Sequence, residues 1–206
     1  MIPAQLAGSS LEMPLARLAA IYERIEIAQE RWIGLTPYRC PDGCGRCCAK
    51  FEPELTEVEA LFLAAWILHN EPALVEENQL DSIKLDSDQE ACVLSDPEGK
   101  FHCRVYGGRP LICRLFAFSG DKAKDGTARF RPCEHMPHSG DRILDETALL
   151  GLYGELPPLM SDFASEADLL MPDCSGKRTP LRLALPGALS KISMLCQFSA
   201  FARQKP

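Results

Sequence analysis

The chain has 206 residues, of which 46% are hydrophobic and 25% are charged, and its formal net charge is −7 with an isoelectric point near 5.2. This composition is typical of a globular protein, and the length predicts a single domain over residues 1–206. Because the chain is acidic and shows no cluster of basic residues, neither a nucleic acid nor a membrane is expected as a partner.

The ten cysteines are the most unusual feature of the composition. The first 18 residues have neither the positive start nor the continuous apolar stretch of a secretory signal. The longest apolar run, residues 60–68, is far shorter than the roughly 20 residues that cross a bilayer. We therefore expect a cytoplasmic protein. In that reducing compartment, closely spaced cysteines indicate metal ligation or redox chemistry more than structural disulfides.

The N-terminal region, residues 1–39, predicts an amphipathic helix. Apolar side chains recur every three or four residues between positions 15 and 33, which places them on one helical face. They are Leu15, Leu18, Tyr22, Ile25 and Trp32. This face is expected to be buried, either against the core of the chain or against a second subunit.

Four cysteines lie within the nine residues "CPDGCGRCC" at 40–48, in a segment whose glycines and prolines permit tight turns around an ion. A second helix is predicted after it. Thr56 and Glu59 have the spacing of a capping box, so the helix is expected to begin there. It is expected to end near His69 and Asn70, with Pro72 opening another helix.

Residues 91–105, "ACVLSDPEGKFHCRV", predict a β-hairpin around the turn sequence "DPEG". Cys92 and Cys103 are equally distant from the midpoint between Pro97 and Glu98. In a regular hairpin they would face each other across the strands and present two thiols on the same side.

The sequence "RPLICRLFAF" predicts a helix that begins near Pro110, with Cys113 in the first turn, where exposed backbone amides favour a thiolate. The C-terminal region, residues 134–206, predicts helices near 143–153 and 184–203 and a loop around 171–180. The expected fold is mainly α with a small β-hairpin. In it, helices flank an irregular cysteine-rich metal-binding core at 40–133.

Eight of the ten cysteines fall within this core and are the candidate metal ligands: Cys40, Cys44, Cys47, Cys48, Cys92, Cys103, Cys113 and Cys133. Four thiolates complete a zinc site or hold one cubane iron–sulfur cluster, so eight suit two such sites, or one site with spare redox thiols. Neighbouring side chains of an extended segment point in opposite directions. Cys47 and Cys48 are therefore expected to serve different sites, or one of them to lie outside the ligand shell.

Three stretches of the sequence resemble one known family. They are "CGRCC" at 44–48, "CVL" at 92–94 with the later Cys103, and "VYGGRPLICRLFAF", which is similar to the signature Tyr-x-x-Arg-Pro-x-x-Cys-Arg-x-Phe. The family is that of the zinc- or iron-chelating domains named for the motif C-x-x-C-x-x-C-C, also called the YkgJ-type cysteine cluster proteins. The resemblance covers about residues 40–120 and implies metal binding. Three residues separate Cys40 from Cys44, where the motif has two.

Other residues are candidates for supporting roles at such a site. The side chains of Arg109 and Arg114 flank Cys113, and either guanidinium could offset the negative charge of a thiolate-bound metal or form a surface salt bridge. Tyr106 and Phe116 are expected to pack beneath the site. Any of the four histidines could replace a cysteine as a metal ligand. His135 and His138 are better candidates than His69 and His102. Cys196 is expected in the core, and Cys174 in a loop.

The predicted cofactor is an iron–sulfur cluster, of the 4Fe-4S type, or zinc, since both favour thiolates. The number of thiols favours the cluster slightly. The predicted function is metal chelation with a redox or carrier role. Two alternatives stay open. One is a metal-dependent enzyme with an open coordination position, and the other is a zinc-stabilised module that binds a protein partner.

Overall fold

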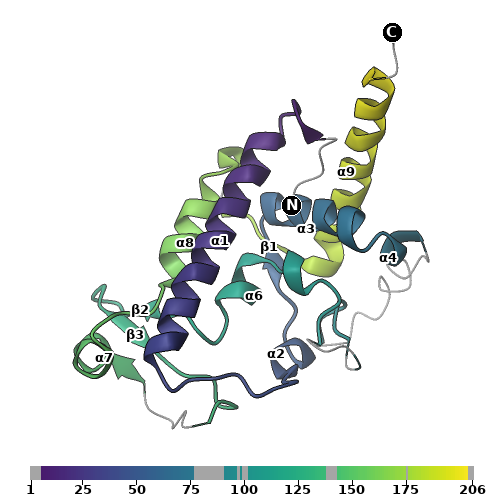
Figure 1. Ribbon diagram of the computed structural model, residues 1–206. Coiled ribbons are helices and arrows are strands. Elements are labelled where there is room, and N and C mark those ends of the chain that lie inside the picture. The colour runs from purple at the N-terminus through teal and green to yellow at the C-terminus, as the bar shows by residue number, and fades with distance from the viewer. Residues whose placement is uncertain are drawn as a thin grey trace. The chain divides into compact units, whose positions relative to one another are not determined.

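The computed structural model describes residues 6–76, 91–96, 98, 102–137, 143–174 and 176–203 (Figure 1). Its helices are α1 (Glu12–Leu35), α2 (Arg46–Ala49), α3 (Glu57–Asn70), α4 (Ala73–Glu76), α6 (Leu111–Leu115), α7 (Glu146–Tyr153), α8 (Met160–Asp168) and α9 (Leu181–Arg203). Its strands are β1 (Glu54–Leu55), β2 (Asp121–Lys122), β3 (Ala128–Phe130), β4 (Leu144–Asp145) and β5 (Thr179–Pro180). Short 3₁₀ turns are η2 (Tyr106–Gly108) and η3 (Pro172–Cys174). The mainly α fold class is confirmed.

The chain divides into two compact units. Unit 1 comprises residues 1–19, 45–110 and 168–206, and unit 2 comprises residues 20–44 and 111–167. The single-domain organisation stays a prediction. None of the helices in the described ranges has the length and hydropathy of a membrane-spanning segment.

Helices α3 and α9 form the core of unit 1, where they pack side by side (Figure 1). Nine of the 14 residues of α3 are buried, so this helix is covered on most of its circumference. The contacting face of α9 repeats at helical spacing and contains Leu181, Leu185, Ala188, Leu189 and Ile192, all buried. The antiparallel pair of β1 and β5 brings the starts of the two helices together.

A capping box begins α3, as the sequence predicts. The Thr56 side chain accepts a hydrogen bond from the Glu59 backbone, and the Glu59 carboxylate accepts one from the Thr56 backbone at 2.9 Å. The Glu59 side chain is 1% exposed, and such a buried charge requires a partner. Arg178 provides it, with one guanidinium nitrogen 3.5 Å from Glu59 and the other 3.1 Å from Asp168. The helix also ends at Asn70, as predicted.

In α1, the five apolar residues that predict an amphipathic helix are all buried, none more than 3% exposed. The helix extends beyond the predicted 15–33 range at both ends. Within unit 2, α1 and α8 lie side by side and are joined by an ion pair between Arg24 and Glu166 (Figure 1).

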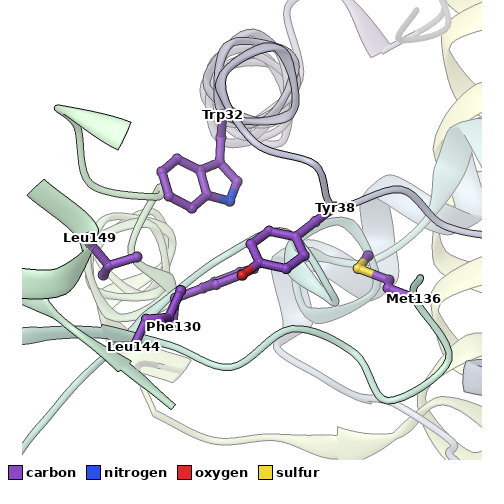
Figure 2. Packing of buried hydrophobic residues seen from close by; sticks show 6 residues of the cluster. All are labelled: Trp32, Tyr38, Phe130, Met136, Leu144 and Leu149. Carbon is purple, nitrogen blue, oxygen red and sulfur yellow. The ribbon is translucent and has the colours of Figure 1, made fainter. Parts of the chain in front are cut away.

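An aromatic cluster forms the core of unit 2. Its buried members are Trp32, Tyr38, Phe130, Met136, Leu144 and Leu149 (Figure 2). Trp32 meets Phe130 and Tyr153 edge to face, with ring centroids 5.4 and 5.3 Å apart. Edge-to-face pairs at this spacing stabilise beyond the area that they bury. The cluster therefore fixes the end of α1 against β3, β4 and α7.

The structure has a β-hairpin at 121–130 that the sequence analysis did not predict. Strands β2 and β3 pair antiparallel, and β3 also pairs with β4. The turn contains Asp125, whose carboxylate accepts a hydrogen bond from the Thr127 backbone at 3.0 Å, and Gly126, whose φ of 86° suits glycine. The "DG" pair at 125–126 is a hairpin signal that the sequence analysis missed.

Alkaline pH should destabilise unit 2 through Tyr38. Burial raises the pKa of Tyr38 to about 12, and the neighbouring Tyr153, whose hydroxyl oxygen lies 3.3 Å from that of Tyr38, adds to the shift. The unfolded phenol titrates near its ordinary pKa of about 10, so this stability is present below pH 10 and is lost as the pH rises through 12. Urea unfolding at pH 9 and pH 11.5 should show the loss. Tyr38→Phe should lose less over the same range, and parallel losses in the two proteins would contradict the prediction.

Candidate metal centre

The eight candidate cysteines divide equally between the two units. Unit 1 holds Cys47, Cys48, Cys92 and Cys103, which we call the unit 1 thiols. Unit 2 holds Cys40, Cys44, Cys113 and Cys133. All eight are free thiols, and the boundary between the units falls within the opening motif, after residue 44.

The adjacent cysteines lie in a helical turn. Residues 46–49 form α2, and the Sγ atoms of Cys47 and Cys48 are 4.0 Å apart. The expectation that these two serve different sites assumed an extended segment, in which neighbouring side chains diverge. That assumption is wrong here, because the helical backbone brings both sulfur atoms to one side.

The predicted hairpin over 91–105 is wrong in register. In the described part of this segment, Ser95 and Cys103 form an isolated antiparallel bridge, so Cys103 lies opposite Ser95 and not opposite Cys92. Pro97 and residues 99–101 of the predicted turn lie outside the described residues. Cys92 is positioned differently, since its backbone N–H donates to the Cys48 carbonyl at 2.9 Å. This hydrogen bond attaches the 91–95 segment to α2.

The four unit 1 thiols interact electrostatically. Burial raises the pKa of Cys92 to about 11 and also raises the pKa of Cys103. The hydrogen bond shared with Cys47 raises the pKa of Cys48, as do burial and the charges of Cys47, Cys103 and Cys92. The same hydrogen bond lowers the pKa of Cys47 to about 6. A negative charge on one thiolate disfavours a negative charge on its neighbours. A bound cation offsets this repulsion and keeps the coordinated thiols deprotonated.

Arg109 supplies positive charge to this group. Its charge lowers the pKa of both Cys47 and Cys103. The guanidinium stacks on the ring of Tyr106, 3.6 Å from the centroid, and its Nε donates to the Tyr106 carbonyl at 3.0 Å. Tyr106 and Phe116 are 40% and 41% exposed, and their packing beneath a metal site stays a prediction.

Arg114 has structural contacts in unit 2. It lies in α6, which begins at Leu111 as predicted, and its side chain is 5% exposed. The guanidinium pairs with Glu26 at 2.5 Å and stacks over Tyr22, 4.2 Å from the ring centroid. These contacts attach α6 to α1, and the salt bridge joins a buried guanidinium to a Glu26 side chain that is 60% exposed. Its role at a metal stays a prediction.

The unit 2 cysteines occupy different surroundings. Cys40 is exposed, and the Cys44 backbone N–H closes a turn with the Pro41 carbonyl at 3.1 Å. Cys113 lies in α6, and Cys133 packs against the aromatic cluster. Within the described part of the chain, no three Cys, His, Asp or Glu side chains converge closely enough to hold an ion as they stand. Metal binding therefore requires the thiols to close around the ion.

Comparison with known families assigns the region that carries these cysteines. Residues 39–134 match the CxxCxxCC family, described as "Putative zinc- or iron-chelating domain". After this match, we call residues 39–134 the CxxCxxCC domain. The match covers just under half of the 206-residue chain, and all eight candidate cysteines lie inside it. No curated protein and no solved structure matches the chain.

A salt bridge that the sequence analysis missed lies close to the CxxCxxCC domain's Cys92. Arg182 Nε is 2.6 Å from Glu52 Oε2, and both side chains are 14% exposed. The two charges shift the pKa of Cys92 in opposite directions. Because 130 positions separate the partners, no local sequence pattern indicates this pair.

Among the described histidines, His102 lies beside the unit 1 thiols. His102 precedes Cys103 and has a positive φ of 51°. His135 lies in unit 2, where its Nε2 is 3.4 Å from Glu134, and His138 lies outside the described residues. Cys196 is half-buried on α9, and the side chain of Cys174 lies outside the described part of the structure.

Proposed function

We propose that the four unit 1 thiols of the CxxCxxCC domain together bind one zinc or iron ion, and that the domain chelates and releases this ion as a carrier. The observation that supports this best is the 4.0 Å separation of the Cys47 and Cys48 sulfur atoms. Two thiolates of a tetrahedral zinc site with Zn–S bonds of about 2.3 Å lie about 3.8 Å apart. The adjacent pair is therefore close to the spacing that one ion requires.

The same separation favours a mononuclear ion over a cubane cluster. In a 4Fe-4S cluster each thiolate binds a different iron, so the four sulfur ligands stand farther apart than around one ion. The cysteine count alone slightly favoured the cluster. With the sulfur separation, zinc becomes the first candidate, and a single iron held by four thiolates the second.

The carrier role is supported by the position of the four thiols, which lie outside the packed core of unit 1. The packing of α3 against α9 uses none of the four cysteines. Cys47 is exposed, and the other three are half-buried. The 91–105 segment has its own buried anchors in Leu94 and Val105, each 1% exposed. An ion at such a place can leave while the helices stay packed.

The second half of the cysteine set, in unit 2, is proposed as the ligand set of a separate ion. This proposal rests on the residue types, because four thiols are enough for one tetrahedral site. Metal stoichiometry decides it, with two ions per chain if both sets bind and one ion if only the unit 1 thiols do.

Metal analysis of protein purified without oxygen is the direct test. We expect zinc, or iron without acid-labile sulfide, at one or two ions per chain. About four irons and four sulfides per chain, with a brown colour, would replace the mononuclear centre with a cluster. Protein that stays free of metal after incubation with excess zinc and iron salts under reducing conditions would refute chelation.

Removing the metal should leave most of the helical structure in place. Because α3 and α9 are packed without the thiols, far-UV circular dichroism should change by less than about a tenth when a chelator strips the ion. Hydrogen exchange should rise in residues 46–49 and 91–105. Cooperative unfolding of unit 1 on chelation would show that the ion is structural, and the carrier role would then be abandoned.

A further inference from the structure

Two backbone features meet beside the unit 1 thiols. His102 has a φ of 51°, a conformation that few non-glycine residues adopt. Gly45 stands at the N-terminal cap of α2, and a Cβ added there would lie 2.3 Å from His102 Cβ and 2.4 Å from His102 Cγ. Only glycine permits this close approach, so the His102 side chain packs directly against the Gly45 backbone.

This contact joins the two segments that carry the thiols. Gly45 leads into α2, which presents Cys47 and Cys48, and His102 immediately precedes Cys103. The His102 carbonyl also accepts a hydrogen bond from the Asp96 backbone at 3.2 Å, which ties it to the 91–96 segment, where Ser95 pairs with Cys103. Movement at the contact therefore changes the distance from the sulfur atoms of Cys47 and Cys48 to that of Cys103.

We propose that His102 is a positioning residue for the metal centre. Its side chain packs against Gly45, and this contact sets the spacing between α2 and Cys103 before the ion binds. The inference rests on the proposed function, since it concerns the affinity of the unit 1 thiols for their ion. The thiols must close around the ion, and a contact that holds the two segments together reduces the conformational freedom lost on binding. His102 acts through this packing and not as a ligand.

The test is a cycle of four proteins, namely the wild type, Gly45→Ala, His102→Gly and the double variant. Zinc affinity is measured by competition with a chromophoric chelator. We expect each single variant to bind about ten times more weakly, because an alanine at 45 pushes the segments apart and a glycine at 102 removes the contact. In the double variant the clash is absent, so Gly45→Ala should add almost nothing to the effect of His102→Gly.

A conservative variant separates packing from ligation. His102→Asn keeps Cβ and Cγ, the atoms that meet Gly45, and asparagine tolerates positive φ, but it has no imidazole nitrogen. We expect its zinc affinity to stay within about threefold of the wild type. Its cobalt-substituted protein should also keep the wild-type thiolate charge-transfer spectrum.

The outcomes are distinguishable. Equal losses from Gly45→Ala in the presence and absence of His102 would overturn the inference while the proposed function stands. His102→Asn with the same loss as His102→Gly and an altered cobalt spectrum would make the imidazole a ligand, which also overturns it. Wild-type protein that binds no ion through the unit 1 thiols would refute the proposed function and this inference together. Circular dichroism confirms that each variant is folded.

Discussion

Replacing Cys48 by serine should weaken metal binding about 100- to 1,000-fold. A structural zinc site gains about 10–16 kcal/mol from four ligands, and the loss of one thiolate removes about a quarter of this. Cys48 is the strongest choice because its sulfur contacts Cys47 and its carbonyl holds the Cys92 segment. Serine preserves the carbonyl, so only the sulfur is tested. Competition with a chromophoric chelator gives the affinity.

The matched control is Cys196→Ser. Cys196 is also half-buried and also lies in unit 1, but it is on α9 and outside the CxxCxxCC domain. Its replacement should leave the affinity unchanged. Equal losses for the two variants would indicate a general effect of thiol removal, and an unchanged Cys48→Ser protein would exclude Cys48 from the ligand set.

Truncating Trp32 to alanine should lower the free energy of unfolding by about 3–5 kcal/mol. The indole is 1% exposed and meets two other rings edge to face, so its removal leaves a cavity at the centre of the unit 2 core. Figure 2 shows Trp32 next to Tyr38, Phe130 and Leu149 in this core. Urea unfolding followed by near-UV circular dichroism measures the loss.

Leu152→Ala is the control for that experiment, since Leu152 is an apolar residue of the same unit that is 64% exposed. Its effect should stay within about 0.5 kcal/mol. The remaining tryptophan, Trp66, lies in unit 1 and reports on that unit by fluorescence. A Trp32→Ala protein as stable as the wild type would show that the aromatic cluster is not the core of unit 2.

The helices could be predicted from sequence because their determinants are local. The capping box of Thr56 and Glu59 fixed the start of α3, and the apolar spacing of Leu15 to Trp32 identified the buried face of α1. Pro110 likewise located the start of α6. In each case residues within one or two turns of each other decide the conformation.

The site was less predictable because its geometry depends on contacts between distant segments. An isolated bridge places Cys103 opposite Ser95, whereas the sequence "DPEG" predicted that Cys103 would face Cys92. The salt bridge of Glu52 with Arg182 joins residues with no sequence pattern in common. The candidate ligands could be named from their spacing, but their division between two units could not.

The family match ends at residue 134, but residues beyond this point also support the structure of the matched region. Helix α3 belongs to the match, yet its buried face is covered by α9, and the Glu59 carboxylate is neutralised by Arg178. A fragment of residues 39–134 would expose that face to water and leave a buried charge without its counterion. The matched region therefore carries the cysteines, whereas residues outside it provide part of the packing and the counterion that α3 requires. Dissection of this protein should retain residues 168–203.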